Sequence, residues 1–170
     1  MGLPQTDRIR PATEHDAALL AELRYEFRAS LDEAAESRHA FTSRCQSWMA
    51  ERLRDDSSGW RCWVALAGDR VTGTVWLQVI EKVPNPVAEP EAHGYVTNLY
   101  VSPELRGRGI GGRLLQMAVD WCGSHGVDAV ILWPTPESRT LYARHGFAAA
   151  EDLMESRGRT TPSTSGGSRG

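Results

Sequence analysis

Apolar residues recur along this chain with two different periods, one typical of helices and one typical of strands. Gaps of three and four residues separate the apolar positions within Glu14–Ser30 and within Phe41–Leu53, which predicts two amphipathic helices. Trp60–Ala67 and Val71–Val83 are rich in β-formers, and the second run alternates strongly. Because only a tight connection around Gly68-Asp69-Arg70 separates them, the two runs should pair as an antiparallel hairpin.

The second half of the chain predicts strands that alternate with helices. Val127–Trp133 is nearly continuous in apolar residues, as expected of a strand covered on both faces. Pro84, Pro86 and Pro90 stiffen the preceding loop and keep it out of any sheet interior. The other predicted elements are a first strand at Asp7–Pro11, a strand at Tyr95–Val101, a helix over Leu114–Cys122 that stops at Gly123, a short helix at Glu137–His145 and a last strand at Phe147–Ser156.

Length and composition indicate one globular domain of 170 residues or fewer. Residues 157–170 have no large apolar side chain to bury, so we expect a disordered tail after a domain of residues 1–156. A net charge of -3 does not favour nucleic acid as a partner. Cys45, Cys62 and Cys122 lack zinc-like or C-x-x-C spacing, which suits free thiols in the cytoplasm. No run is long or apolar enough to predict a membrane segment, and monomer and homodimer remain equally open.

The most informative stretch is a cluster of glycines and arginines just before the helix over Leu114–Cys122. Each glycine in a helical turn costs about 0.8–1 kcal/mol relative to alanine, so the cluster needs a reason. Without Cβ atoms, backbone N–H groups can converge on an anion at the positive end of a helix, and guanidinium groups suit phosphate. The alternative is a glycine-rich surface turn that caps an ordinary helix. The candidate phosphate-binding residues are Arg106, Gly107, Arg108, Gly109, Ile110, Gly111 and Gly112, and Arg113 adds a third arginine.

Three glycines of this cluster also satisfy G-x-G-x-x-G, the dinucleotide fingerprint. That motif sits directly after a strand and has an acidic residue about 20 positions on, whereas here Leu132 and Trp133 occupy that place. No G-x-x-x-x-G-K-[ST] sequence is present either. An NAD-type domain is therefore disfavoured, and a nucleoside-triphosphate P-loop is excluded.

Arg106, Gly109 and Gly111 instead occupy the defining positions of R/Q-x-x-G-x-G/A, and the segment resembles the acetyl-CoA signature of the GNAT superfamily of N-acyltransferases. Two further segments resemble that family. Gly94–Val101 is similar to its acyl-CoA strand, and Leu141–Phe147 is similar to its closing L-Y-x-x-x-G-F motif. The resemblance covers most of residues 8–155.

This resemblance implies an α/β (α+β) fold in which helices flank a mixed central sheet, splayed between the fourth and fifth strands. It implies acetyl-CoA as co-substrate, no metal, and direct attack by a primary amine of a small molecule or peptide in a ternary complex. A non-catalytic acyl-CoA-binding sensor is the alternative. The implied site residues are the main chain of Leu99, Tyr100 and Val101 along the acyl group and Tyr142 as the general acid, with Ser138 beside the cofactor. Thr135 and Ser138 replace the asparagine and alanine common in the family, which weakens any side-chain hydrogen bond to the cofactor there.

Tyr95, Thr97 and Asn98 stand where many relatives of that family carry a glutamate base, so Thr97 or Asn98 could hold a relaying water. Glu81, Glu91 and His93 border the expected acceptor loop, where solvated surface groups are the alternative reading. Two acidic segments suggest a cationic acceptor, because an acidic field attracts cations. Their residues are Glu81, Glu89 and Glu91 in the proline-rich loop, and Asp32, Glu33 and Glu36 between the first two helices.

Overall fold

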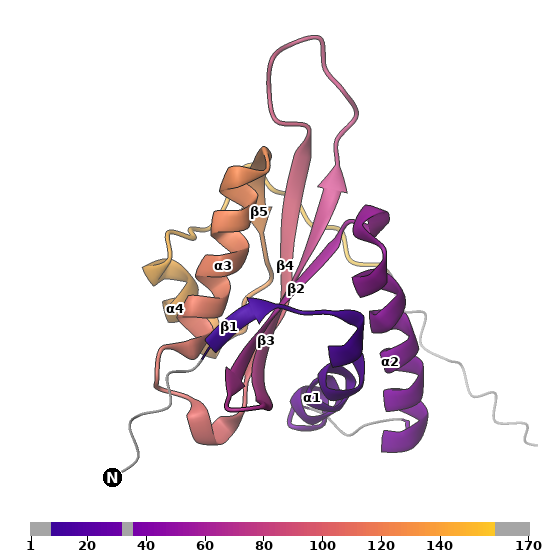
Figure 1. Ribbon diagram of the computed structural model, residues 1–170. Coiled ribbons are helices and arrows are strands. Elements are labelled where there is room, and N and C mark those ends of the chain that lie inside the picture. The colour runs from indigo at the N-terminus through magenta and orange to yellow at the C-terminus, as the bar shows by residue number, and fades with distance from the viewer. Residues whose placement is uncertain (1–7, 32–35, 159–170) are drawn as a thin grey trace, which may run out of the picture.

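The structure is a computed structural model that describes residues 8–31 and 36–158. Helices cover both faces of one mixed sheet (Figure 1). The elements in chain order are β1 (Arg8–Pro11), α1 (Ala17–Ala29), α2 (Arg38–Arg54), β2 (Trp60–Ala67), β3 (Arg70–Glu81), β4 (Ala92–Val101), α3 (Ile110–Ser124), β5 (Val127–Ile131) and α4 (Arg139–Arg144). Within the described residues, no helix is long and apolar enough to span a membrane.

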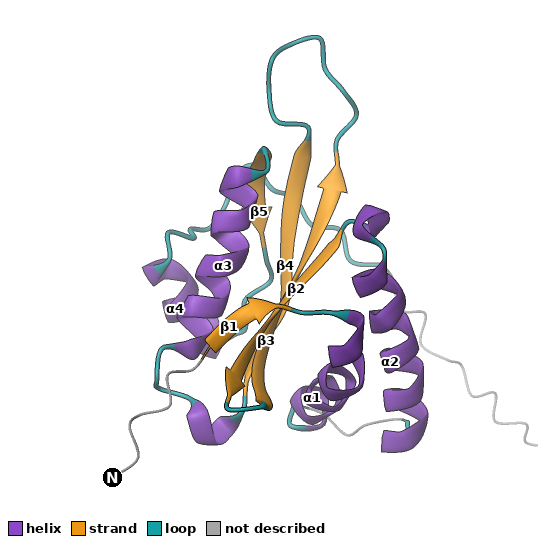
Figure 2. Cartoon of the chain, viewed as in Figure 1, coloured by secondary structure: helices purple, strands orange, loops and turns teal. Residues whose placement is uncertain are grey.

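The strands lie in the order β1-β2-β3-β4-β5, and only β4 and β5 run parallel. The parallel pairing follows from the chain path, because α3 carries the chain back across one face before β5 begins (Figure 2). The two strands pair only from Ala92 to Tyr95, opposite Val127 to Ile131. β4 then continues to Val101 while the other chain turns away. The predicted splay between the fourth and fifth strands is confirmed.

Two apolar cores lie on opposite faces of the sheet. α1 and α2 bury Leu20, Leu23 and Met49 against one face, whereas α3 buries Leu114 and Leu115 against the other. Neighbouring residues of one strand reach opposite cores, as the pleat requires: on β4, Tyr100 belongs to the first core and Leu99 packs on the second.

Polar contacts fix where the first helices begin. The Asp16 carboxylate accepts two hydrogen bonds from the Arg10 guanidinium, both at 2.8 Å, and one from the Thr13 backbone N–H at 2.7 Å. A 3₁₀ turn at Glu14–Asp16 therefore precedes α1, in place of the helical start expected at Glu14. Ser37 caps α2, since its hydroxyl accepts from the Ala40 N–H at 3.3 Å.

The predicted last strand at Phe147–Ser156 is wrong, because this segment is irregular throughout. Ala148, Ala149 and Ala150 have low strand propensity and cannot fill the pleated surface of a neighbour. The expectation that β5 is covered on both faces is also wrong, since Asp128 and Ala129 are exposed. With no strand on its outer side in the described part of the chain, β5 forms an edge of the sheet. Asp32, Glu33 and most of the predicted tail, residues 159–170, lie outside the described residues.

Candidate active site

The site is organised around the point where β4 and β5 diverge. Beyond Tyr95 the register of β4 against β3 slips by one residue, since Trp76 pairs with Thr97 but Thr74 pairs with Tyr100. Asn98 lies in this β-bulge with a φ of +51°, in the left-handed region. The bulge re-aims the side chains of β4 next to Leu99, where the resemblance implies that the acyl group lies.

The glycine-rich loop leads from β4 to the N-terminus of α3. Gly107 and Gly109 both have a φ of +76°, and a Cβ atom at either position would meet nothing within 4 Å. Gly109 is the N-cap of α3 and supplies no side-chain acceptor to the N–H groups of the first turn. The N–H groups at the positive end of α3 therefore have no side-chain cap, and the glycines leave the space beside them free of large side chains. This geometry has room for a pyrophosphate, and the anion cradle stays a prediction.

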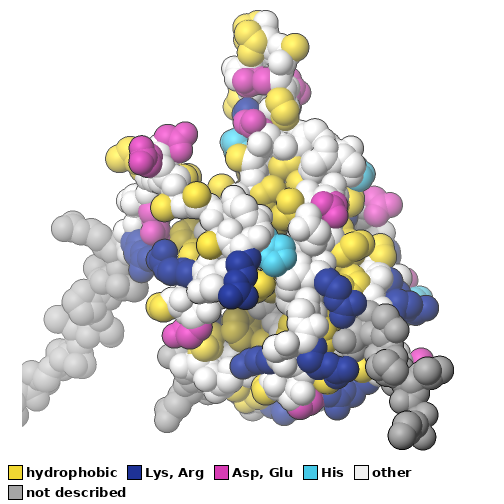
Figure 3. Space-filling view, turned by 90° about the vertical axis from the view of Figure 1, so that its left-hand side faces the viewer, with side chains coloured by type: hydrophobic (Ala, Val, Ile, Leu, Met, Phe, Trp, Pro, Cys, Tyr) yellow, Lys and Arg dark blue, Asp and Glu magenta, His cyan; other side chains and the backbone are white. Residues whose placement is uncertain are grey.

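The arginines of the loop have different surroundings. Arg106 donates from Nε to the Val101 carbonyl oxygen at 3.0 Å, and its guanidinium lies 5.6 Å from the centroid of the Tyr100 ring. Arg106 therefore ties the loop to the end of β4, which is a positioning role the sequence did not indicate. Arg108 and Arg113 are exposed. Figure 3 looks onto the side of the molecule that carries α3 and α4, where basic side chains are spread over the middle and lower part of the surface.

The last two glycines of the cluster are not equivalent. A Cβ at Gly111 would make ordinary contacts of 3.7 Å with Leu141 and Val101. A Cβ at Gly112 would lie 2.9 Å from Cε1 and 3.0 Å from Nε2 of His145, just beyond the end of α4. Gly112 therefore permits close packing of α4 on α3, so its glycine has a structural reason apart from phosphate.

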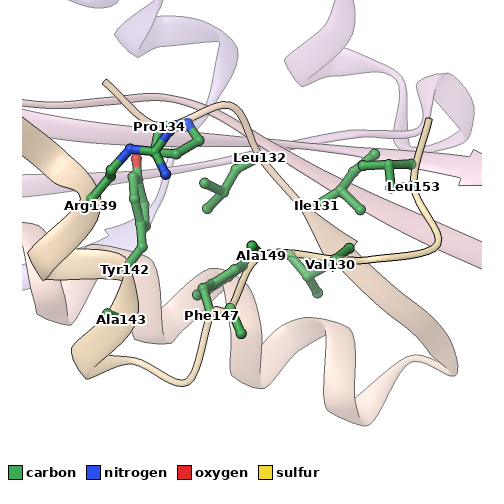
Figure 4. Close-up of a pocket in the computed structure, with 12 residues that line it drawn as sticks. Val130, Ile131, Leu132, Pro134, Arg139, Tyr142, Ala143, Phe147, Ala149 and Leu153 are labelled. Carbon is green, nitrogen blue, oxygen red and sulfur yellow. The ribbon is translucent and has the colours of Figure 1, made fainter. Parts of the chain in front are cut away.

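α4 places Tyr142 next to the chain that leaves β5. The Tyr142 ring packs edge-on against Phe147 at 5.8 Å between centroids. Burial raises the pKa of Tyr142, and a hydrogen bond from Ser138 partly opposes that shift. Figure 4 shows the Tyr142 hydroxyl directed toward Arg139 and Pro134, at the mouth of a cavity of about 440 Å³ between α4, β5 and the irregular segment after Phe147. Ser138, expected beside the cofactor, donates from Oγ to the Thr135 carbonyl oxygen at 3.0 Å.

A second cavity, of about 340 Å³, lies across β4 from Tyr142, between α1, α2 and the sheet. Arg24 enters it from α1 and donates from Nη1 to Asn98 Oδ1 at 3.0 Å. Burial lowers the pKa of Arg24, and the nearby positive charge of Arg28 lowers it further. The aromatic residues of the wall are Phe41, Trp48, Trp60, Trp76 and Tyr95.

The sequence analysis did not single out Arg24, although a signal was present. Leu20, Phe27 and Leu31 define the apolar stripe of the first helix, and Arg24 stands in that stripe four residues after Leu20. An arginine on the buried face of an amphipathic helix is unusual and marks a polar site.

Tyr95 connects the two sides of the site. It is the last residue of β4 that pairs with β5, and its hydroxyl donates to Thr97 Oγ1 at 3.2 Å. Its ring packs edge-on against Trp133 at 4.9 Å. Tyr95 also lines the second cavity together with Arg24, while Trp133 lies on the chain that leads from β5 to α4 and Tyr142. The candidate acid and the arginine of the second cavity therefore lie on either side of one residue at the apex of the splay.

Two of the four described acidic residues predicted to attract a cation, Glu36 and Glu89, form ion pairs. Glu89 forms an ion pair with Lys82 at 3.3 Å, and Lys82 also pairs with Asp128 at 3.0 Å. Glu36 pairs with Arg44. The loop between β3 and β4 projects beyond the sheet, so its acids lie away from the body of the molecule (Figure 1).

Comparison with known proteins agrees with the class that this geometry defines, an acyl-CoA-binding α/β domain with a splayed sheet. The family model "Acetyltransferase (GNAT) family" matches residues 20–147, and the chain belongs to this family. A mycothiol acetyltransferase of Geodermatophilus obscurus is 35% identical over an alignment of 137 residues, and the match covers 71% of this chain and 42% of that protein. The chain thus spans less than half the length of that relative.

Solved structures show the same fold. A GCN5-related N-acetyltransferase from Ralstonia eutropha is 27% identical with a TM-score of 0.71, over 89% of this chain and 98% of that one. A predicted acetyltransferase from Clostridium acetobutylicum, solved with acetyl-CoA, is 20% identical with a TM-score of 0.73, over 89% and 96% of the two chains. Acetyltransferases of this family use acetyl-CoA, and the open cradle at α3 fits its pyrophosphate.

Proposed function

We propose that this protein is an N-acetyltransferase that transfers the acetyl group of acetyl-CoA to a primary amine by direct attack in a ternary complex. The observation that carries the proposal is the arrangement around Tyr95. The anion cradle and Tyr142 lie on one side of the diverging strands, and a cavity suited to a small acceptor lies on the other. A protein that only binds acyl-CoA has no need for the second cavity.

Acetyl-CoA, when bound, supplies an activated thioester; the chain's own groups hold and polarise it. Backbone N–H groups from Gly107 to Gly112 would bind the pyrophosphate. Main-chain groups at Leu99, Tyr100 and Val101 would line the acyl oxygen, where one aimed donor is worth roughly 2.7–4 kcal/mol in the transition state.

Tyr142 would give its proton to the departing thiolate. A phenol has an ordinary pKa of about 10, and burial raises the pKa of Tyr142, so the group is protonated at neutral pH. Ser138 would lie beside the cofactor, as the family resemblance implies.

Removal of the amine proton would pass through water. Thr97 Oγ1 accepts from Tyr95 and can still donate and accept once more, and Asn98 keeps its amide N–H groups free of a partner within the described residues. Both side chains border the second cavity. They can therefore orient a water beside the amine, in the role the sequence analysis assigned to them.

The proposal is tested by pairing a binding assay with a transfer assay. Calorimetry with CoA measures the cradle, and release of free thiol from acetyl-CoA against an amine library measures transfer. Gly111→Glu should abolish CoA binding, because its carboxylate would occupy and repel the phosphate site, whereas Gly111→Ala should bind normally because the family signature allows alanine there. Unaltered CoA affinity in folded Gly111→Glu would remove the cradle assignment. If the protein bound CoA but released no thiol with any amine, the alternative of a non-catalytic acyl-CoA-binding sensor would replace the proposed enzyme.

A cationic acceptor stays a prediction from the acidic loop. Neutralising Glu81, Glu89 and Glu91 together should raise the KM of such an amine at low salt, where screening is weak, and leave the KM of acetyl-CoA unchanged. Because Glu89 is already paired with Lys82, the expected effect is small. An unchanged amine KM would mean that the acceptor is selected elsewhere.

A further inference from the structure

We propose that the cavity beside β4 selects an acceptor that carries a carboxylate close to its amine and an apolar or aromatic body, as in a free aromatic α-amino acid. This proposal rests on the proposed function and names its substrate class. It depends on three features of the cavity: an arginine without an opposing acid, a wall of aromatic rings, and the place of both relative to the reacting centre.

The Arg24 guanidinium lies 5.6 Å from the centroid of the Phe27 ring, a contact that supplies no neutralising negative charge. In the part of the chain that the structure describes, no carboxylate forms an ion pair with Arg24, and its side chain donates a hydrogen bond to the neutral Asn98 oxygen. The side chain is half-buried, and burial lowers its pKa. Burying a cation costs free energy unless an anion pairs with it. A ligand with one negative charge would therefore provide the partner that Arg24 lacks among the described residues.

The other arginine of the cavity does not offer the same charge. Arg44 pairs with Glu36, and its guanidinium lies 5.4 Å from the centroid of the Phe41 ring. The cavity therefore carries one uncompensated positive charge, which matches a carboxylate better than a phosphate dianion. Among the residues that the structure describes, none that lines the cavity is acidic.

The rest of the wall is apolar and aromatic. Trp48 packs against Trp60 at 5.2 Å and against Trp76 at 5.8 Å, so the rings form one continuous surface. The Nε1–H of Trp76 is buried and has no acceptor among the described residues. A cavity of about 340 Å³ is at the small end of ligand sites and suits one ring with a short polar head.

The position of Arg24 indicates that the carboxylate and the amine of the acceptor should be close to each other. Arg24 contacts Asn98, and Asn98 adjoins Leu99, along which the acyl group is proposed to lie. An anion on Arg24 therefore sits beside the reacting centre, with the aromatic rings behind it. An acceptor with its carboxylate and amine on the same carbon meets this arrangement, whereas a long polyamine does not.

Three probes separate the contributions: L-phenylalanine, which has both groups, phenethylamine, which lacks the carboxylate, and 3-phenylpropionate, which lacks the amine. Transfer is measured as thiol release from acetyl-CoA. Binding is measured by tryptophan fluorescence, since Trp48, Trp60 and Trp76 line the cavity. The binding assay reports on the cavity even if no acetyl group is transferred.

We expect the wild-type protein to prefer L-phenylalanine to phenethylamine in kcat/KM. Arg24→Met should lower that preference about 10- to 100-fold, the usual value of charge-assisted hydrogen bonds to a carboxylate. Comparing the ratio between variants cancels the intrinsic reactivity of the two amines. Arg28→Met, which removes the same charge from an exposed position one turn along α1, should keep the ratio. Arg24→Lys should retain part of the preference, because it keeps the charge and loses the fork.

Each outcome decides one of the two proposals. Acetyl transfer with phenethylamine or a polyamine preferred over L-phenylalanine would overturn carboxylate recognition and leave the acetyltransferase standing. Binding of 3-phenylpropionate that weakens in Arg24→Met, with no transfer to any amine, would uphold the anion site and overturn the proposed function. A preference unchanged in folded Arg24→Met and Arg24→Lys would assign Arg24 to structure alone.

Discussion

Gly112 provides a sharp test of how α3 and α4 are held together. An added Cβ would approach the His145 ring to 2.9–3.0 Å, whereas the same atom at Gly111 would find contacts of 3.7 Å. The His145 ring cannot swing away freely, because its Nδ1 lies 2.9 Å from the Leu141 carbonyl oxygen. Gly112→Ala should therefore strain the helix pair, and Gly111→Ala should not.

The magnitude follows from comparing the two variants. Both gain the helix propensity of alanine, about 0.8–1 kcal/mol, so that gain cancels in the difference. The remaining overpacking costs about 1–3 kcal/mol. For a chain of this length 1 kcal/mol shifts Tm by roughly 2–4 °C, so Gly112→Ala should melt about 2–12 °C below Gly111→Ala.

Thermal unfolding followed by circular dichroism measures this difference, and a second substitution identifies its cause. His145→Ala in the Gly112→Ala background should remove the strain, so that the two effects are non-additive. Because Tyr142 lies on α4, Gly112→Ala should also lower kcat, since a displacement of about 1 Å can cost roughly 100-fold. Equal Tm values for the two alanine variants, within about 1 °C, would refute the contact between Gly112 and His145.

Three further outcomes are expected. Tyr142→Phe keeps the ring packing and removes the proton, so kcat should fall roughly 10²–10⁴-fold with CoA affinity little altered; a near-normal rate would leave water or substrate as the donor. Arg10 holds the pKa of Asp16 below its ordinary value, so this carboxylate stabilises the fold above an unfolded pKa of about 3.9 and loses that effect as pH falls through its folded pKa. Asp16→Asn should cost about 1–2 kcal/mol near neutral pH, with Tm values converging with wild type below about pH 4. A chain that ends at Arg157 should keep its Tm and activity, and a loss of more than a few degrees would show that the tail docks.

Most elements could be predicted from the sequence because their patterns are strong. The two early helices and the hairpin of β2 and β3 are confirmed within a few residues. The last strand failed for a local reason: Phe147 packs on Tyr142, and the alanines after it neither alternate nor offer branched side chains. The prediction that β5 is buried on both faces was also wrong, because an apolar run does not reveal whether another segment will cover the strand.

The candidate site could be predicted only where a sequence motif points directly to a chemical role. The glycine motif predicts a cradle, yet it could not distinguish Gly111 from Gly112, because His145 makes that distinction through a tertiary contact. Arg24 was visible as a break in an apolar stripe, but its meaning depends on Asn98, 74 residues away. Such roles depend on contacts between segments that are distant along the chain, and these contacts cannot be inferred from one sequence alone.

The short pairing of β4 with β5 also has a consequence for amide hydrogen exchange. β2, β3 and β4 follow one another along the chain and pair over most of their length, whereas β5 joins the sheet only opposite Ala92–Tyr95. Segments held by few interactions open without the rest of the protein unfolding, so amides of β5 and α4 should exchange faster than those of β3. A CoA molecule bound between the splayed strands would bridge this part to the rest. Adding CoA should therefore slow amide exchange most in β5 and α4. The cofactor would then enter through this side of the site, which is the least stable side without ligand.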